Sequence, residues 1–200
     1  PGPGTPDKGQ LHVVCVARLI ERKGQHYLID AVKRIVDSGI DVILSLIGTG
    51  DSKREYENQA RSLGIQDRVR FVGYVSREEI SKYYKAAHVF VLPSYNEGMS
   101  LAVLEAMASG LPVVVTRTGG TAELVEEGVN GFVFNWGDVE TLSRHLLNLA
   151  SDRALARRLG AASRIRAIDY SWPAIADRFL ALFFKQTPDA YSMLRKPGGH

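Results

Sequence analysis

The feature that most constrains how this chain folds is the regular alternation of short apolar segments with longer segments of helical periodicity. The apolar segments predict strands near residues 11–17, 41–47, 69–72, 89–92, 113–116 and 131–134. Helical patterns lie near residues 24–37, 51–63, 76–86, 101–109, 121–126, 139–149, 154–168 and 171–184. Strands that alternate with helices favour a parallel sheet covered on both faces. We therefore predict the α/β class, with a doubly wound, Rossmann-like parallel sheet of about six strands.

Length and composition predict one large folded unit with polar extensions. The chain has 200 residues, of which 45% are hydrophobic and 24% charged, as is ordinary for a soluble globular protein. Residues 1–9 are rich in proline and glycine and are expected to form a linker. Residues 10–184 are expected to form the domain, and the polar, aperiodic residues 185–200 a mobile tail. Because the chain does not begin with methionine, we expect it to be a piece of a longer protein.

Charge, hydropathy and cysteine usage disfavour several functional classes. A formal net charge of +3, with the basic residues scattered, argues against binding to nucleic acid. No run approaches the roughly 18 apolar residues of a membrane span, and no secretory signal is visible, so a cytoplasmic location is expected. The lone Cys15 lies in the first predicted strand and is expected to be a small buried hydrophobe. The sequence has no Asp-x-Asp pair and no His/Cys cluster at ligand spacing, so no metal is expected.

Residues 96–110 (NEGMSLAVLEAMASG) place two carboxylates, Glu97 and Glu105, around the start of an apolar helix. Ser100 is a suitable N-cap, which puts Glu97 in the preceding loop and Glu105 one turn inside the helix. This helix is apolar nearly all round and is expected to be buried, and a buried carboxylate needs hydrogen bonds or a counter-charge. A ribose diol would offer two donors, and an arginine such as Arg18 would neutralise the charge. The helix alone leaves both interpretations open.

The loop after the first predicted strand holds two cations, Arg18 and Lys23. In parallel sheets, ligands bind beyond the carboxyl ends of the strands, where helix N-termini present free N–H groups. Both cations can reach over this edge, and Gly98, Met99 and Ser100 occupy the equivalent place after a later strand. Spacing alone nevertheless favours two solvent-exposed charges, because charged residues are mostly exposed.

Several further motifs occur in a fixed order along the chain. They are residues 16–24 (VARLIERKG), 46–51 (LIGTGD), 71–75 (FVGYV), 118–123 (TGGTAE) and 130–133 (NGFV). Together with residues 96–110, they make the chain resemble the retaining, GT-B fold glycosyltransferases of the group 1 type, which carry two glutamates separated by seven residues. The resemblance covers roughly residues 10–184 and is to the C-terminal, donor-binding domain of these enzymes.

The resemblance implies a role for each candidate residue. Arg18 and Lys23 would grip the diphosphate and Glu97 would bind hydroxyls of the donor sugar, which makes these three the catalytic candidates. Glu105 would hold the ribose of the nucleotide. The backbone would complete the donor site through Gly48 beside the nucleotide, Val75 at the base, and Gly98, Met99, Ser100 and Leu101 at the sugar and phosphate.

The resemblance also implies an activity, which is retaining transfer of a hexose from a UDP-, GDP- or ADP-linked sugar. The acceptor would be a glycan, a lipid or a small molecule, as in polysaccharide biosynthesis, and an N-terminal Rossmann domain absent from this sequence would hold it. The diphosphate itself would help deprotonate the acceptor, so no protein nucleophile, cofactor or metal is expected. This piece alone would then be inactive, and the full-length protein could associate peripherally with the inner face of a membrane.

Other functions remain open. A sugar-nucleotide epimerase or a phosphorylase can use the same fold, although a phosphorylase would need a cofactor lysine. A non-catalytic module that binds sugar nucleotides is the third alternative.

Overall fold

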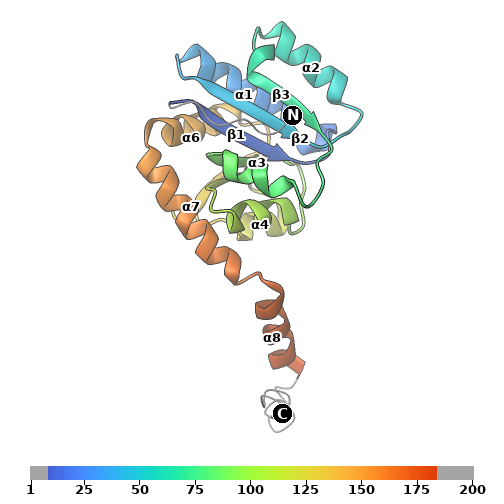
Figure 1. The fold of residues 1–200 in the computed structure, drawn as a ribbon, viewed down its shortest axis with the longest axis vertical. Coiled ribbons are helices and arrows are strands. Elements are labelled where there is room, and N and C mark those ends of the chain that lie inside the picture. The colour runs from blue at the N-terminus through green and yellow to red at the C-terminus, as the bar shows by residue number, and fades with distance from the viewer. Residues whose placement is uncertain (1–8, 184–200) are drawn as a thin grey trace.

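The structure, a computed structural model, describes residues 9–183 and has one six-stranded sheet at its centre (Figure 1). The strands are β1 (Leu11–Val16), β2 (Val42–Ile47), β3 (Val69–Gly73), β4 (Val89–Leu92), β5 (Val113–Thr116) and β6 (Gly131–Phe134). All neighbours pair in parallel, in the order β3-β2-β1-β4-β5-β6. The α/β class and the doubly wound parallel sheet predicted from the sequence are therefore confirmed.

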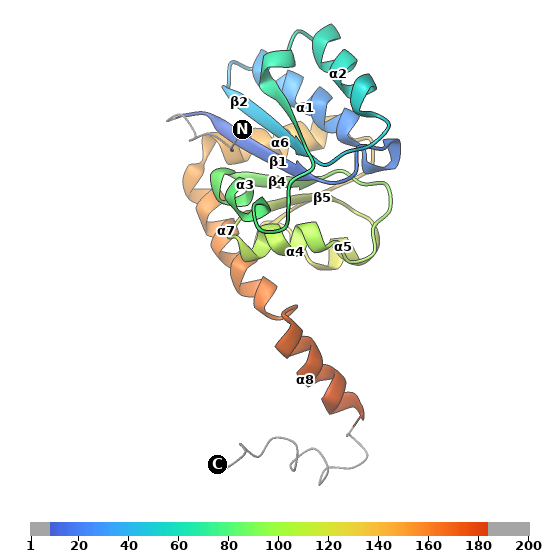
Figure 2. The ribbon, with the colours of Figure 1, turned by 45° about the vertical axis from the view of Figure 1, so that its right-hand side comes forward.

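Eight α-helices and two short 3-10 helices connect and follow the strands within the described residues (Figures 1 and 2). The α-helices are α1 (Gln25–Asp37), α2 (Lys53–Ser62), α3 (Ile80–Ala86), α4 (Leu101–Ala108), α5 (Gly119–Glu123), α6 (Val139–Ser151), α7 (Arg153–Ile168) and α8 (Trp172–Phe183). The 3-10 helices are η1 (Glu21–Lys23) and η2 (Gln66–Arg68).

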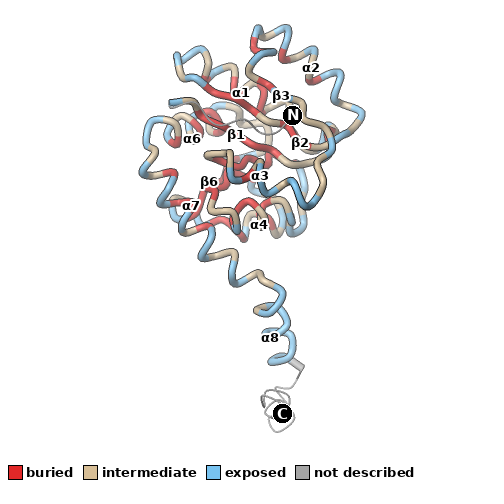
Figure 3. The backbone as a smooth tube through the Cα atoms, in the orientation of Figure 1, coloured by how far each residue is buried: buried red, intermediate tan, exposed pale blue. Residues whose placement is uncertain are grey.

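Two apolar cores hold the layers together, one on each face of the sheet. Strand residues alternate between them: Val13 and Cys15 face the core formed with α1, α2 and α6, whereas Val14 faces the core formed with α3 and α4. This period of two is the geometry of an extended chain buried on both sides. In Figure 3 the buried positions accordingly concentrate in the strands and on the inner sides of the helices.

Two helices differ most in extent from the sequence prediction, and local hydrogen bonds account for each difference. Helix α3 begins at Ile80, later than expected, because the Ser76 carbonyl accepts from the N–H groups of Glu79 and Ile80 and forms a turn first. Helix α5 spans Gly119–Glu123 instead of 121–126. The Asn130 side chain accepts from the Glu126 N–H and so fixes residues after α5 in a loop.

Helix α8 extends away from the sheet and its covering helices (Figures 1 and 2). Its apolar side chains are largely exposed, among them Trp172 at 82% and Leu182 at 71%. Within residues 9–183, no helix has both the length and the apolar character that crossing a bilayer requires. The predicted linker and tail fall almost entirely on residues 1–8 and 184–200, outside the described residues.

Candidate functional site

The candidate site lies where the order of the strands reverses. Strands β1 and β4 are neighbours, but the chain proceeds from β1 to β2 on one side and from β4 to β5 on the other. The two connections therefore leave in opposite directions, and the place beyond the carboxyl ends of the two strands is the usual ligand position in such sheets. Arg18 and Lys23 follow β1, and Glu97 follows β4.

Lys23 and Glu97 meet directly at this place. The Lys23 ammonium forms a salt bridge with the Glu97 carboxylate, and the two side chains are only 16% and 15% exposed. The loops that carry them are also joined through the backbone, because the Arg22 carbonyl accepts from the Tyr95 N–H at 2.7 Å and from the Ser94 hydroxyl at 3.3 Å. The predicted catalytic candidates from two distant segments thus share one site.

Gly24 allows the two loops to come this close. Its φ of 68° lies in the left-handed region, and a Cβ at this position would lie 2.0 Å from the Pro93 carbonyl oxygen. Both facts require glycine. The turn at Gly24 ends η1 and starts α1, which fixes Lys23 against the end of β4.

The N-terminus of α4 lies beside Glu97 and leaves backbone donors free. Ser100 is at the N-cap position, as predicted, but its hydroxyl makes no capping hydrogen bond. The Ser100 N–H instead donates to Thr121 Oγ1 at 3.3 Å, and the Thr121 hydroxyl donates to the Gly98 carbonyl at 2.7 Å. Within the described residues, no hydrogen bond engages the N–H groups of Gly98, Met99 or Leu101. Such unpaired donors at a helix start favour an anion.

The second carboxylate, Glu105, accepts a hydrogen bond from a tyrosine on another helix. The Tyr84 hydroxyl of α3 donates to Glu105 Oε2 at 3.0 Å. Burial, followed by the adjacent Glu105 charge, raises the pKa of the Tyr84 hydroxyl, so it stays a donor. In residues 9–183, no salt bridge joins Glu105 to Arg18 or to any other cation.

Helix α4 is also less enclosed than its sequence suggests. Glu105 is partly exposed, and Leu101 at the start of the helix is 70% exposed. Only the face of α4 with Val103, Ala106 and Met107 is buried. The expectation of a helix buried nearly all round was therefore wrong, because α4 covers one face of the sheet and its outer side meets solvent.

The remaining candidates lie along the same edge of the sheet. Arg18 is exposed just past β1, and no salt bridge within the described chain engages it. Gly48 follows β2, and its N–H donates to the Gly73 carbonyl at the end of β3 at 2.8 Å. Val75 lies two residues beyond β3 and packs partly against the core under α3 and α4. Arg18, Lys23, Gly48, Val75 and the loop residues before α4 thus lie beyond the carboxyl ends of β1, β2, β3 and β4, whereas Glu105 lies within α4.

Cys15 lies beneath this edge as a buried strand residue, as predicted. It is 1% exposed, and burial raises the pKa of its thiol to about 12. Among residues 9–183, no three His, Cys, Asp or Glu side chains lie close enough together to hold a metal ion.

The family model described as "Glycosyl transferases group 1" matches residues 3–166, most of the chain. The chain belongs to this family. Among curated glycosyltransferases, the lipopolysaccharide core biosynthesis glycosyltransferase LpsE of Rhizobium meliloti is 34% identical over 171 residues, which are 85% of this chain and 48% of LpsE. The D-inositol 3-phosphate glycosyltransferase of Corynebacterium jeikeium is 33% identical over 92% of this chain and 46% of that protein. The present chain therefore spans about half the length of these relatives.

Solved structures agree with this assignment. Sucrose-phosphate synthase from Thermosynechococcus elongatus superposes with a TM-score of 0.80 at 32% identity, over 88% of this chain and 45% of that one. Anabaena HepE in complex with UDP superposes with a TM-score of 0.77 at 27% identity, over 89% of this chain and 49% of HepE. The C-terminal domain of LpcC from Francisella tularensis, a group 1 family protein, shares the fold with a TM-score of 0.75 at 24% identity, over 81% of this chain and 87% of that domain. The chain thus corresponds to the C-terminal domain of a GT-B glycosyltransferase.

Several residues that shape the site could not be recognised in the sequence of this glycosyltransferase domain. Tyr84 and Thr121 contact the candidate segment from other elements, and only the tertiary structure brings them there. The same holds for Gly119, because a Cβ on it would lie 2.0 Å from the Glu97 carbonyl oxygen. The TGGTAE motif contains both Gly119 and Thr121 and was the one available signal.

Proposed function

We propose that this domain binds a nucleotide diphosphate sugar as the donor half of a retaining hexosyltransferase. The observation that carries the proposal is the meeting of Lys23 and Glu97 at the reversal point of the sheet, beside the unpaired N–H groups at the start of α4. A cation and backbone donors suit a diphosphate, and a carboxylate suits sugar hydroxyls. HepE, a structural relative, was solved with UDP, which supports a nucleotide ligand.

Each side chain then has one task. Lys23 and the exposed Arg18 hold the diphosphate and stabilise the negative charge that grows on it as the sugar departs. Glu97 hydrogen-bonds hydroxyls of the transferred sugar. Glu105 accepts hydrogen bonds from the ribose, while the Tyr84 hydroxyl holds one of its carboxylate oxygens in place. Gly48 and Val75 border the nucleotide and base.

The salt bridge implies that the two side chains change partners when a donor binds. Lys23 and Glu97 satisfy each other in the structure. A donor that brings phosphate to Lys23 and hydroxyls to Glu97 gives each side chain a new partner. Phosphate alone would leave the carboxylate without one. The pair therefore favours a ligand that carries both groups.

We propose that the acceptor is held by an N-terminal Rossmann domain of the full-length protein, and that the present chain alone has no transferase activity. The diphosphate then helps to deprotonate the acceptor hydroxyl, without a protein nucleophile or metal. A cytoplasmic enzyme of polysaccharide biosynthesis, with peripheral contact to the membrane, fits the same proposal.

Thermal unfolding in the presence of UDP, GDP, ADP and their sugars tests the proposal. A ligand at ~100 times its dissociation constant adds about 2.7 kcal/mol to the free energy of unfolding. We expect one nucleotide family to raise the melting temperature, and its sugar form to raise it further. If no nucleotide or sugar nucleotide shifts the transition, the donor-site assignment is wrong. Conversion of a bound sugar nucleotide into its epimer would favour the epimerase alternative.

A further inference from the structure

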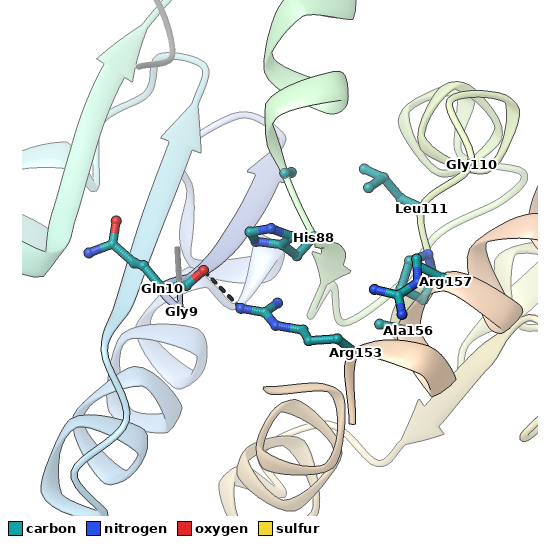
Figure 4. Close-up of a pocket in the computed structure, with 10 residues that line it drawn as sticks. Gly9, Gln10, His88, Gly110, Leu111, Arg153, Ala156 and Arg157 are labelled. Atoms are coloured by element: carbon teal, nitrogen blue, oxygen red, sulfur yellow. Dashed lines mark hydrogen bonds between the residues drawn. The ribbon is translucent and has the colours of Figure 1, made fainter. Parts of the chain in front are cut away.

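A cavity lies at the edge of the sheet opposite the candidate site, at the amino ends of the strands. Its volume is about 390 Å³, within the range of small-molecule sites. Gln10 precedes β1, His88 precedes β4, Gly110 to Pro112 precede β5, and Arg153 and Arg157 come from the first turns of α7. Figure 4 shows the side chains of His88, Arg153 and Arg157 around this space.

Arg153 brings an incompletely satisfied cation to the cavity. Its Nη2 donates to the Gln10 carbonyl at 2.8 Å, but its Nη1 is buried and has no hydrogen-bond partner among the described residues. Burial, followed by the nearby Arg157 charge, lowers the pKa of Arg153. Two cations that repel each other, one with a buried donor unused, carry a cost that an acceptor or a counter-charge would relieve.

No carboxylate supplies that counter-charge within the described chain. The described lining residues include no Asp or Glu, and among residues 9–183 neither Arg153 nor Arg157 forms a salt bridge. Asp152 is next to Arg153, but its side chain caps α7 by accepting from the Leu155 N–H at 2.8 Å.

His88 supplies a third donor with a defined tautomer. Its Nδ1 accepts from the His12 N–H at 2.9 Å, so in the neutral ring the proton is on Nε2. Burial, then the charges of Arg153 and His12, lowers the pKa of His88 to about 4. At neutral pH the ring is therefore an uncharged N–H donor beside two guanidinium groups.

We propose that this cavity binds the phosphoryl group of a small phosphorylated molecule, at a site separate from the donor site. Guanidinium groups and an imidazole N–H match the several oxygens of a phosphate monoester. The ligand would be anchored by Arg153, Arg157 and His88, and the cavity is larger than one phosphate ion, which leaves room for the organic part of the molecule.

Titration of the 200-residue chain with inorganic phosphate and glycerol 3-phosphate, at constant ionic strength set with NaCl, tests the proposal. The readouts are calorimetry and the NMR signals of the histidine rings. We expect saturable binding that moves the His88 signal. Arg157 is exposed, so Arg157→Gln is expected to fold, and it should weaken binding about tenfold or more. The matched control is Arg158→Gln, which removes a neighbouring exposed charge on α7 outside the cavity and should leave affinity nearly unchanged.

Several outcomes would overturn the proposal. Equal losses in Arg157→Gln and Arg158→Gln would mean nonspecific attraction to a basic helix. Loss of phosphate binding in Lys23→Ala, with binding kept in Arg157→Gln, would place the phosphate in the donor site. Binding of citrate but not of either phosphate would refute the phosphoryl assignment. Binding that appears only in Asp7→Asn would mean that a carboxylate of the chain itself occupies the cavity.

Discussion

The Lys23 ammonium and the Glu97 carboxylate form a salt bridge although 74 positions separate them in the sequence. The pair exists because β1 and β4 are adjacent in the sheet while their connections diverge. Because each side chain is a partner of the other, replacing them one at a time tests what each contributes to ligand binding.

Replacing Lys23 or Arg18 should weaken the contacts to the diphosphate but not those to the nucleoside. Lys23→Ala or Arg18→Ala should weaken the binding of a nucleoside diphosphate by about 1.5 to 3 kcal/mol, the usual value of a charge-assisted hydrogen bond. The binding of the nucleoside should be unchanged. Calorimetric titration measures both. Lys33→Ala, which removes a partly exposed lysine paired with Asp37 on α1, is the control. Equal losses for nucleoside and diphosphate would show that the changes damage the fold instead.

Replacing each of the two glutamates should change ligand binding in a different way. Glu105→Ala should weaken the binding of nucleotide and of sugar nucleotide alike, by about 1 to 3 kcal/mol, because both ligands contain the ribose. Glu97→Ala should weaken only the binding of the sugar nucleotide, and in the full-length enzyme it should also reduce turnover. Calorimetric titration of each variant with both ligands measures this.

Tyr84→Phe is the matched variant for the Glu105 assignment. It keeps the carboxylate but removes the hydroxyl that donates to it. We expect a smaller loss of nucleotide affinity than in Glu105→Ala. If Glu105→Ala leaves nucleotide binding intact and only lowers thermal stability, Glu105 has a structural role and the ribose assignment fails.

Gly24→Ala should destabilise the domain more than an alanine at a comparable glycine. A non-glycine residue in the left-handed region costs about 1 to 3 kcal/mol, and at Gly24 the new methyl group would also overlap the Pro93 carbonyl. Gly39 has a φ of 84° with no atom within 4 Å of a Cβ, so Gly39→Ala measures the backbone term alone. Urea unfolding of both variants gives the difference, and equal losses would contradict the close contact.

Stability should fall in acid partly because of His88. Its pKa is lowered to about 4 in the folded chain from an ordinary 6.5, so the unfolded chain binds the proton first as the pH falls. The contribution of the neutral ring is therefore complete above pH 6.5 and is lost progressively down to about pH 4. His88→Asn places an amide oxygen near the position of Nδ1 and should flatten this part of the pH profile of the melting temperature. An unchanged profile would show that other groups cause the acid sensitivity.

Much of the fold could be predicted from the sequence because its strands are apolar runs with clear ends. Pro93 follows β4, Pro112 precedes β5 and Gly131 begins β6, and the predicted limits of these three strands match the structure. The start of α3 was misplaced because residues 76–79 have helix-forming side chains but begin as a turn.

The sequence predicts which segments contribute to the candidate site but not the contacts between them. Sequence indicated that Arg18, Lys23 and Glu97 lie at one edge, since each follows a strand. Sequence could not show that Lys23 pairs with Glu97 or that Tyr84 pairs with Glu105, because these contacts depend on which strands and helices become neighbours. The ligand roles of these residues remain predictions.

The exposed position of α8 has a consequence for how this segment behaves in solution. An isolated helix shorter than about 12 to 15 residues is marginal in water, and α8 has 12. Most of its side chains, including Trp172, pack against little of the domain, so tertiary contacts add little to its helicity. Trp172 to Phe183 should therefore interconvert between helix and coil, and contact with a covering surface would shift that equilibrium. The affinity for such a surface would then include the free energy of ordering α8.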